Sequence, residues 1–112
     1  MKTNSTLRPP AVVKRYFETS NRRDVAAITE CFTRDAAVED QFGRRDGRAA
    51  IQQWIEEITR KYEPTFVPLK PAATEADVAI TVSVSGHFPG SPVQLDFHFR
   101  LRCRKIAAMT IE

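Results

Sequence analysis

The sequence predicts an α+β fold in which three N-terminal helices pack on one strongly curved antiparallel sheet. Apolar residues recur three and four positions apart in three segments before residue 63, which is the spacing of one helix face. From residue 65 onward they alternate with polar residues instead, which is typical of strands with one buried face. Helices that precede a run of strands indicate a helical layer on one face of a sheet, and a chain of 112 residues suffices for one domain.

The first predicted helix runs from about Pro10 to Ser20. Prolines are accepted in the first turn of a helix, where the missing amide donors are not needed. The apolar stripe of this helix consists of Val12, Val13, Tyr16 and Phe17. We expect a second, short helix capped by Asp24, with an apolar stripe that comprises Val25, Ile28, Cys31 and Phe32.

A short strand is predicted between the second and third helices, since Ala36, Val38, Asp40 and Phe42 alternate with other residues. Residues 42–47 are predicted to form a loop, with Asp46 as a candidate cap for the third helix. That helix has the clearest period in the chain, from Ile51, Trp54, Ile55, Ile58 and Tyr62. It should end before Pro64, because the residue ahead of a proline disfavours helical geometry.

Four strands are expected in the second half of the chain. Residues 65–69 form the first, and Pro68 within it indicates an edge strand or a bulge. Residues 78–85 and 93–101 form the next two, on either side of a Pro-Gly-Ser-Pro turn at 89–92, and residues 106–111 form the last. The turn at 102–104 lacks the glycine that tight hairpins favour.

Composition and charge exclude several classes of protein. The 17 basic and 14 acidic residues are interleaved, without the continuous basic stripe that nucleic-acid binding requires. No apolar run approaches the roughly 20 residues of a membrane span. Residues 1–8 lack the apolar stretch of a signal peptide, so we expect a flexible lead-in to a single cytoplasmic domain at 9–112. The two histidines, His87 and His98, lack partners at metal-ligand spacing, and we expect neither a metal nor a cofactor.

Asp40 is a candidate catalytic residue. It shares a strand face with Ala36 and Val38, so the pleat that buries them also directs its carboxylate toward the helices. A carboxylate on an apolar face must find hydrogen-bond donors, raise its pKa or line a cavity. The alternative is a structural role, in which Asp40 anchors the loop at 42–47.

Tyr16 on the first helix is a second candidate. If this helix lies across the mouth of the curved sheet, the phenol and the Asp40 carboxylate meet over one cavity. Enolisation of a ketone requires such a pair, because a base removes the proton beside the carbonyl while a donor stabilises the oxygen. We expect the apolar wall to come from Trp54, Val82, Phe97, Phe99, Phe32 and Ile58. The alternative for Tyr16 and for this wall is ordinary core packing.

With Tyr16 and Asp40 in these places, the chain resembles the nuclear transport factor 2-like superfamily. Within that superfamily it is most similar to the ketosteroid isomerases and the SnoaL-like polyketide cyclases. The resemblance runs from about Pro10 to the end, through the segments AVVKRY (11–16), DAAVED (35–40), GRAAI (47–51) and HFR (98–100). It implies a cone-shaped, cystatin-like fold, whereas the superfamily includes isomerases, cyclases, dehydratases, epoxide hydrolases and non-enzymes.

The resemblance also implies roles for single residues. Tyr16 matches the oxyanion-hole tyrosine of the isomerases and Asp40 matches their general base. Their second oxygen donor, an aspartate, falls at Phe97, while Asp96 is one position away and on the opposite sheet face. Their supporting helix tyrosine is replaced by Ile55.

Three functions follow as hypotheses. The first is an isomerase-like or cyclase-like enzyme that uses Asp40 and Tyr16 for proton transfer on a small apolar ring ketone or a polyketide-like compound. The second is a module that binds an apolar ligand without chemistry. The third is homodimerisation through the outer sheet face, formed by Gln94, Asp96, His98 and Arg100.

Overall fold

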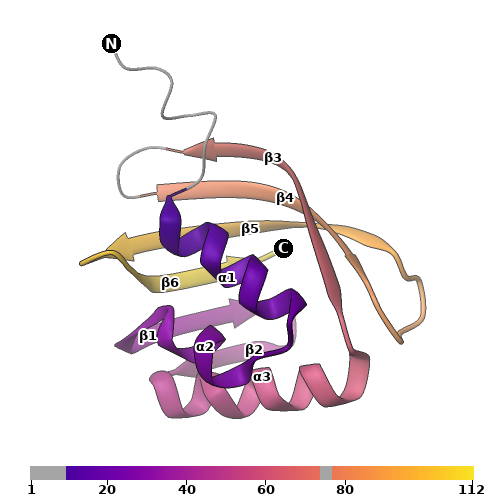
Figure 1. Ribbon diagram of the computed structural model, residues 1–112, viewed down its shortest axis with the longest axis horizontal. Coiled ribbons are helices and arrows are strands. Elements are labelled where there is room, and N and C mark those ends of the chain that lie inside the picture. The colour runs from indigo at the N-terminus through magenta and orange to yellow at the C-terminus, as the bar shows by residue number, and fades with distance from the viewer. Residues whose placement is uncertain (1–9, 74–76) are drawn as a thin grey trace.

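The computed structural model describes residues 10–73 and 77–112, so the predicted lead-in at residues 1–8 lies outside the described residues. Three helices and six strands make up this part of the chain, and the strands form one sheet in the order β2-β1-β6-β5-β4-β3. The helices pack on the sheet, which curves around them (Figure 1). The predicted α+β architecture is confirmed. The sheet is mostly antiparallel, and β1 and β6 are its parallel pair.

Helix α1 (Ala11–Asn21) has the predicted bounds within one residue and buries Val13, Tyr16 and Phe17. Its end is tied to the sheet by the side chain of Asn21. The Asn21 Nδ2 donates to the carbonyl oxygen of Phe66 at 2.9 Å, and the amide of Phe66 donates to Asn21 Oδ1 at 2.7 Å. This pair fixes how α1 lies across the curved sheet.

Helix α2 (Val25–Glu30) begins as predicted, because the amide of Ala27 donates to the capping Asp24 carboxylate at 3.2 Å. It ends earlier than expected. Phe32 does not continue the helix but starts strand β1 (Phe32–Asp40), where it pairs with Ile106 and is fully buried. The strand therefore begins four residues before the predicted Ala36, since pairing with β6 outweighs the local helical period.

Strand β2 (Gly43–Asp46) replaces the loop that was expected at 42–47. It pairs with β1 around a two-residue connection, with Asp40 opposite Gly43 and Val38 opposite Arg45. Asp46 does not cap helix α3 (Arg48–Tyr62). Gly47 stands at that position, while Asp46 Oδ1 accepts a hydrogen bond from Arg44 Nε at 2.9 Å.

Helix α3 buries Ile51, Trp54 and Ile55 and ends before Pro64, as predicted. It leads into β3 (Thr65–Ala73), which is an edge strand of the sheet. The ladder of β3 with β4 shifts register between Pro68 and Lys70. The interpretation of Pro68 as a mark of an edge or a bulge is thus confirmed.

Strands β4 (Asp77–Ser85), β5 (Val93–Arg102) and β6 (Lys105–Ile111) complete the sheet. The buried positions of β4 and β5 are Val78, Ile80, Val82, Val84, Phe97 and Phe99. At the β5–β6 turn, Cys103 and Arg104 both adopt left-handed backbone conformations, with φ of 53° and 64°. The tight turn therefore forms without glycine, at the cost of backbone strain.

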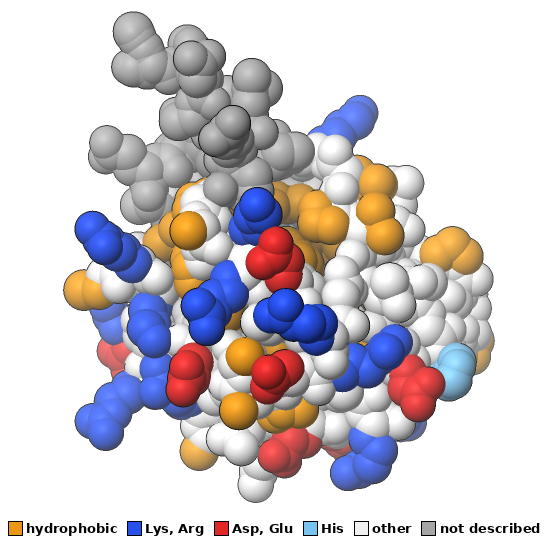
Figure 2. All heavy atoms as spheres, viewed as in Figure 1, with side chains coloured by type: hydrophobic (Ala, Val, Ile, Leu, Met, Phe, Trp, Pro, Cys, Tyr) orange, Lys and Arg blue, Asp and Glu red, His pale blue; other side chains and the backbone are white. Residues whose placement is uncertain are grey.

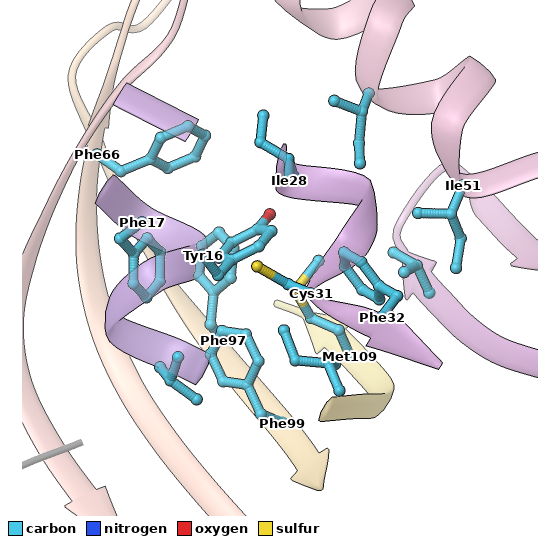
Figure 3. Close-up of a cluster of buried hydrophobic side chains, with 14 of the residues drawn as sticks. Tyr16, Phe17, Ile28, Cys31, Phe32, Ile51, Phe66, Phe97, Phe99 and Met109 are labelled. Carbon is cyan, nitrogen blue, oxygen red and sulfur yellow. The ribbon is translucent and has the colours of Figure 1, made fainter. Parts of the chain in front are cut away.

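Aromatic rings dominate the core between the helices and the sheet (Figure 3). The Tyr16 ring makes edge contacts with Phe17, Phe32 and Phe99, with centroids 5.1 to 5.9 Å apart. Phe97 and Phe99 stack on each other at 6.1 Å. These contacts hold α1 in a fixed position against β5.

Basic and acidic side chains are interspersed over the helical face of the molecule (Figure 2). This distribution agrees with the interleaving of charges along the sequence. Among the described residues, none of the helices has the length and apolar character needed to cross a membrane.

Candidate functional site

A cavity of about 290 Å³ lies between helix α3 and the inner face of the sheet, where α3 leads into β3. Most of its wall is apolar: Phe42, Trp54, Ile58, Pro64, Phe66, Val84, Leu95, Phe97 and Ile111. The other lining residues carry polar groups and are Tyr16, Asp40, Arg45, Glu57, Lys61 and Tyr62. Such a volume is near the lower end of the range for small-molecule sites, and an apolar wall with a few polar groups is their usual composition.

Asp40 lies at the end of β1 with its side chain on the cavity side, as the strand alternation predicted. Its Oδ1 accepts hydrogen bonds from the amides of Phe42 at 2.9 Å and Gly43 at 3.1 Å. The interpretation of Asp40 as an anchor of the following turn is therefore correct. The same side chain also lines the cavity, so the two interpretations are compatible.

The two oxygens of the Asp40 carboxylate differ in their surroundings. Oδ1 also accepts a hydrogen bond from Arg45 Nη1 at 2.8 Å. In this ion pair the Arg45 side chain is 23% exposed and the Asp40 side chain is 14% exposed. Among the described residues, Oδ2 accepts no hydrogen bond, and it is not sealed from solvent. One oxygen thus holds the carboxylate in place, and the other is available to a ligand.

Arg45 is a site residue that the sequence analysis missed. It lies opposite the buried Val38 on the β1–β2 ladder, so its side chain is on the inner face. Its guanidinium carbon lies 5.2 Å above the Trp54 ring, within the range of a cation–π contact. In a hairpin with Asp40 opposite Gly43, Arg45 lies on the same face as Asp40. The sequence analysis did not find this pair because it treated residues 42–47 as a loop.

Tyr16 also lines the cavity, but its side chain is almost fully buried among aromatic rings. Burial raises the pKa of the phenol well above its usual value, and a hydrogen bond with the Ser20 side chain opposes part of that rise. The hydroxyl points toward Ile28 of α2 in Figure 3. Within the described residues, no hydrogen bond joins Tyr16 to Asp40, so they share a cavity without direct contact.

The predicted apolar wall is divided by the structure into two groups. Trp54, Ile58 and Phe97 line the cavity. Phe32, Val82 and Phe99 do not: they are at most 2% exposed and belong to the packed core. A residue's strand face is set by alternation, but whether it meets a cavity or another side chain depends on its position along the strand.

Comparison with known proteins identifies the family of this chain. The sequence profile of the SnoaL-like domain matches residues 13–109. The chain belongs to the SnoaL-like domain family. This membership confirms the resemblance to the nuclear transport factor 2-like superfamily. A search of curated proteins found no match to the chain.

Two solved structures illustrate the similarity of this SnoaL-like domain to others. A protein from Sinorhizobium meliloti, proposed to be a polyketide cyclase, is 33% identical with a TM-score of 0.89. That match covers 93% of this chain and 95% of the other. An epoxide hydrolase/cyclase-like enzyme of pyran-ring formation in the polyether salinomycin is 27% identical with a TM-score of 0.79, over 89% and 85% of the two chains.

A third structure shares the fold alone. It is a hypothetical protein with a ketosteroid isomerase-like fold from Catenulispora acidiphila, solved in complex with trimethylamine. It is 19% identical with a TM-score of 0.82, over 94% of this chain and 86% of the other.

This SnoaL-like domain departs from the isomerase pattern at two buried positions. Phe97, where the resemblance places the second oxygen donor, lines the cavity with an apolar ring. Ile55, where the resemblance places the supporting tyrosine, is 2% exposed. Asp96 points to the outer face, where Thr81 Oγ1 donates to it at 2.8 Å, as its sequence position predicted. Neither position supplies a donor to the cavity.

Other polar groups lie at the edge of the cavity. Glu57 and Lys61 line it from α3, one turn apart, and Lys61 Nζ lies 5.3 Å from the Tyr62 ring. Within residues 10–73 and 77–112, no group of three or more His, Cys, Asp or Glu side chains is arranged to hold a metal ion.

Proposed function

We propose that this SnoaL-like domain is an enzyme that transfers a proton on a small apolar ring ketone or polyketide-like compound. Asp40 acts as the general base and Tyr16 donates to the carbonyl oxygen. The observation that supports this most is that both residues line one apolar-walled cavity, while Asp40 Oδ2 accepts no hydrogen bond from the described residues. The 33% identical relative, itself proposed to be a polyketide cyclase, supports the same substrate class.

The environment of each group suits this role. Oδ1 of Asp40 is fixed by two backbone amides and Arg45, so Oδ2 can accept a proton without a change of side-chain conformation. The phenol of Tyr16 is protonated, as a donor to a carbonyl oxygen must be, and burial raises its pKa further. An apolar wall strengthens both interactions because it excludes water.

The direct test is hydrogen exchange at the carbon beside a ketone. Wild-type protein is mixed with 2-tetralone in deuterated water, and loss of the α-proton signals is followed by NMR. We expect Asp40→Asn to slow this exchange by about 10²- to 10⁴-fold. The matched control is Asp96→Asn, which removes a carboxylate from the outer face and should leave the rate unchanged. Equal rates for wild type and Asp40→Asn would overturn the proposal.

A second candidate is sequestration of an apolar ligand without chemistry. The apolar residues at Phe97 and Ile55 favour it, as does the contact of the Tyr16 phenol with Ser20. In this case wild type shows no exchange above the buffer rate, and Asp40→Asn leaves the affinity for 2-tetralone unchanged.

We also propose that the domain forms a homodimer through the outer sheet face. Gln94, Asp96, His98 and Arg100 are exposed there on alternate positions of β5. A monomer in light scattering at high protein concentration would remove this proposal, which is compatible with either function.

A further inference from the structure

We infer that Arg45 binds an anionic oxygen of the ligand in the cavity, and that it thereby stabilises the negative charge that the proposed proton transfer leaves on that oxygen. The inference rests on the proposed role of Asp40 as proton acceptor. It assigns Arg45 the part of a second oxygen donor, which Phe97 and Ile55 cannot supply.

The donors of Arg45 are only partly used by the protein. Nη1 donates to Asp40 Oδ1 at 2.8 Å and to the carbonyl oxygen of Gly43 at 3.1 Å. Among the described residues, Nε and Nη2 donate to none, and neither is sealed from solvent. A guanidinium has five N–H groups in one plane, so those on Nε and Nη2 remain for a ligand.

The guanidinium is also held rigidly at the cavity. The Asp40 carboxylate holds one end of the guanidinium, and the guanidinium carbon lies over the Trp54 ring, 5.2 Å from the ring centroid. Both partners line the cavity, as Arg45 itself does. A donor that is already oriented loses little conformational freedom when it binds an oxygen.

The arrangement places a base beside a cationic donor. Asp40 Oδ2 accepts no hydrogen bond from the described residues, while Oδ1 accepts one from Arg45 Nη1. The N–H groups on Nε and Nη2 of Arg45 remain for a ligand. In a ketone, the acidic C–H group and the carbonyl oxygen are also close together, because the C–H carbon is bonded to the carbonyl carbon. When Oδ2 takes the proton, the electron pair of the C–H bond moves into the C–C–O unit. The charge that develops on oxygen then meets the N–H groups of Arg45.

The role of Arg45 can be tested on the state that follows proton transfer. In the complex that follows proton transfer, Asp40 is neutral and the ligand carries the negative charge next to Arg45. The Asp40→Asn variant with a bound aromatic carboxylate reproduces that distribution of charge.

The experiment uses 2-naphthoate, with 2-naphthamide as its uncharged counterpart, and calorimetry to measure dissociation constants. The variants are Asp40→Asn alone and combined with Arg45→Gln or with Arg44→Gln. Arg44 is the matched control because it precedes Arg45 on β2 but is opposite the exposed Glu39 and pairs with Asp46. No turnover is measured, so failure of the proposed catalysis in the exchange test and failure of this inference are distinguishable.

We expect Asp40→Asn to bind 2-naphthoate more tightly than wild type, because the competing carboxylate is gone. Adding Arg45→Gln should weaken 2-naphthoate binding by about 10-fold or more and change 2-naphthamide binding by less than about twofold. Adding Arg44→Gln should change neither. Equal losses for both probes, no loss, or the same loss with Arg44→Gln would overturn the inference. If Arg45→Gln fails to fold in a thermal melt, Arg45→Lys replaces it, and the expected weakening is then smaller but still confined to the carboxylate.

Discussion

The amide of Phe42 donates a hydrogen bond to Oδ1 of Asp40 at 2.9 Å, which closes the turn of the β1–β2 hairpin. The residue proposed as general base therefore also holds its own strand end. A loss of activity on substitution of Asp40 can reflect lost chemistry or a lost turn. Its structural contribution has to be measured separately.

Two substitutions of Asp40 separate these effects. Asp40→Ala removes the acceptor of two backbone amides and of Arg45, and should lower the free energy of unfolding by about 1–3 kcal/mol. Asp40→Asn keeps an acceptor at this position and should cost about 1 kcal/mol or less. Urea denaturation of both variants measures the difference. Similar losses for Ala and Asn would show that charge, not acceptor geometry, stabilises the turn.

The buried phenol of Tyr16 predicts a pH dependence of stability. Its pKa is raised in the folded chain, mainly by burial, relative to the usual value of 10.0. Above about pH 10 the unfolded chain releases this proton while the folded chain keeps it. Unfolding then releases a proton, so the free energy of unfolding falls by about 1.4 kcal/mol per pH unit. Below the usual pKa both states hold the proton, and this contribution is constant.

The Tyr16→Phe variant isolates this contribution, since it keeps the aromatic contacts with Phe17, Phe32 and Phe99. Urea denaturation of wild type and variant should give parallel stabilities below about pH 10 and a steeper decline for wild type above it. The same slope for both proteins at alkaline pH would show that Tyr16 ionises freely in the folded state.

Phe42 offers a test of the cavity mouth. Its side chain is 82% exposed, yet it lines the cavity. Phe42→Ser should therefore change the free energy of unfolding by less than about 0.5 kcal/mol. It should nevertheless weaken the binding of 2-naphthamide about fivefold, because an apolar contact with the ligand is lost. Val67→Ser is the matched control, since Val67 is 51% exposed and does not line the cavity. Equal affinities for Phe42→Ser and wild type would place the ligand elsewhere.

Gly86 tests the packing at the end of β4. A Cβ at this position would lie 2.7 Å from the carbonyl oxygen of Tyr62, which also accepts a hydrogen bond from the amide of His87 at 2.8 Å. Gly86→Ala should therefore lower the free energy of unfolding by about 1–3 kcal/mol, because backbone must move. Since Tyr62 and Pro64 line the cavity, the affinity for 2-naphthamide should fall as well. If Gly86→Ala had the same unfolding midpoint as wild type, the backbone at the junction of α3 and β3 would be able to move at little energetic cost.

Local pattern was sufficient for most elements of this fold. The 3.6-residue period of Ile51, Trp54 and Ile55 defined α3, and Pro64 marked its end. Alternation also placed Asp40 on the inner face and Asp96 on the outer one, because the period of a strand is two whatever its partners are.

The tertiary structure alone decided the features that depend on distant partners. Phe32 fits a helical stripe as well as a strand, and its pairing with Ile106 of β6 made it a strand residue. Arg45 faces the cavity because β2 pairs with β1 in a particular register. The composition of residues 42–47 does not reveal that register. Likewise, Phe97 lines the cavity while Phe99, two residues along the same face, is covered by Tyr16 and Phe17. Periodicity fixes the side of an element on which a residue lies, but only the packing of helices against the sheet determines what that residue meets there.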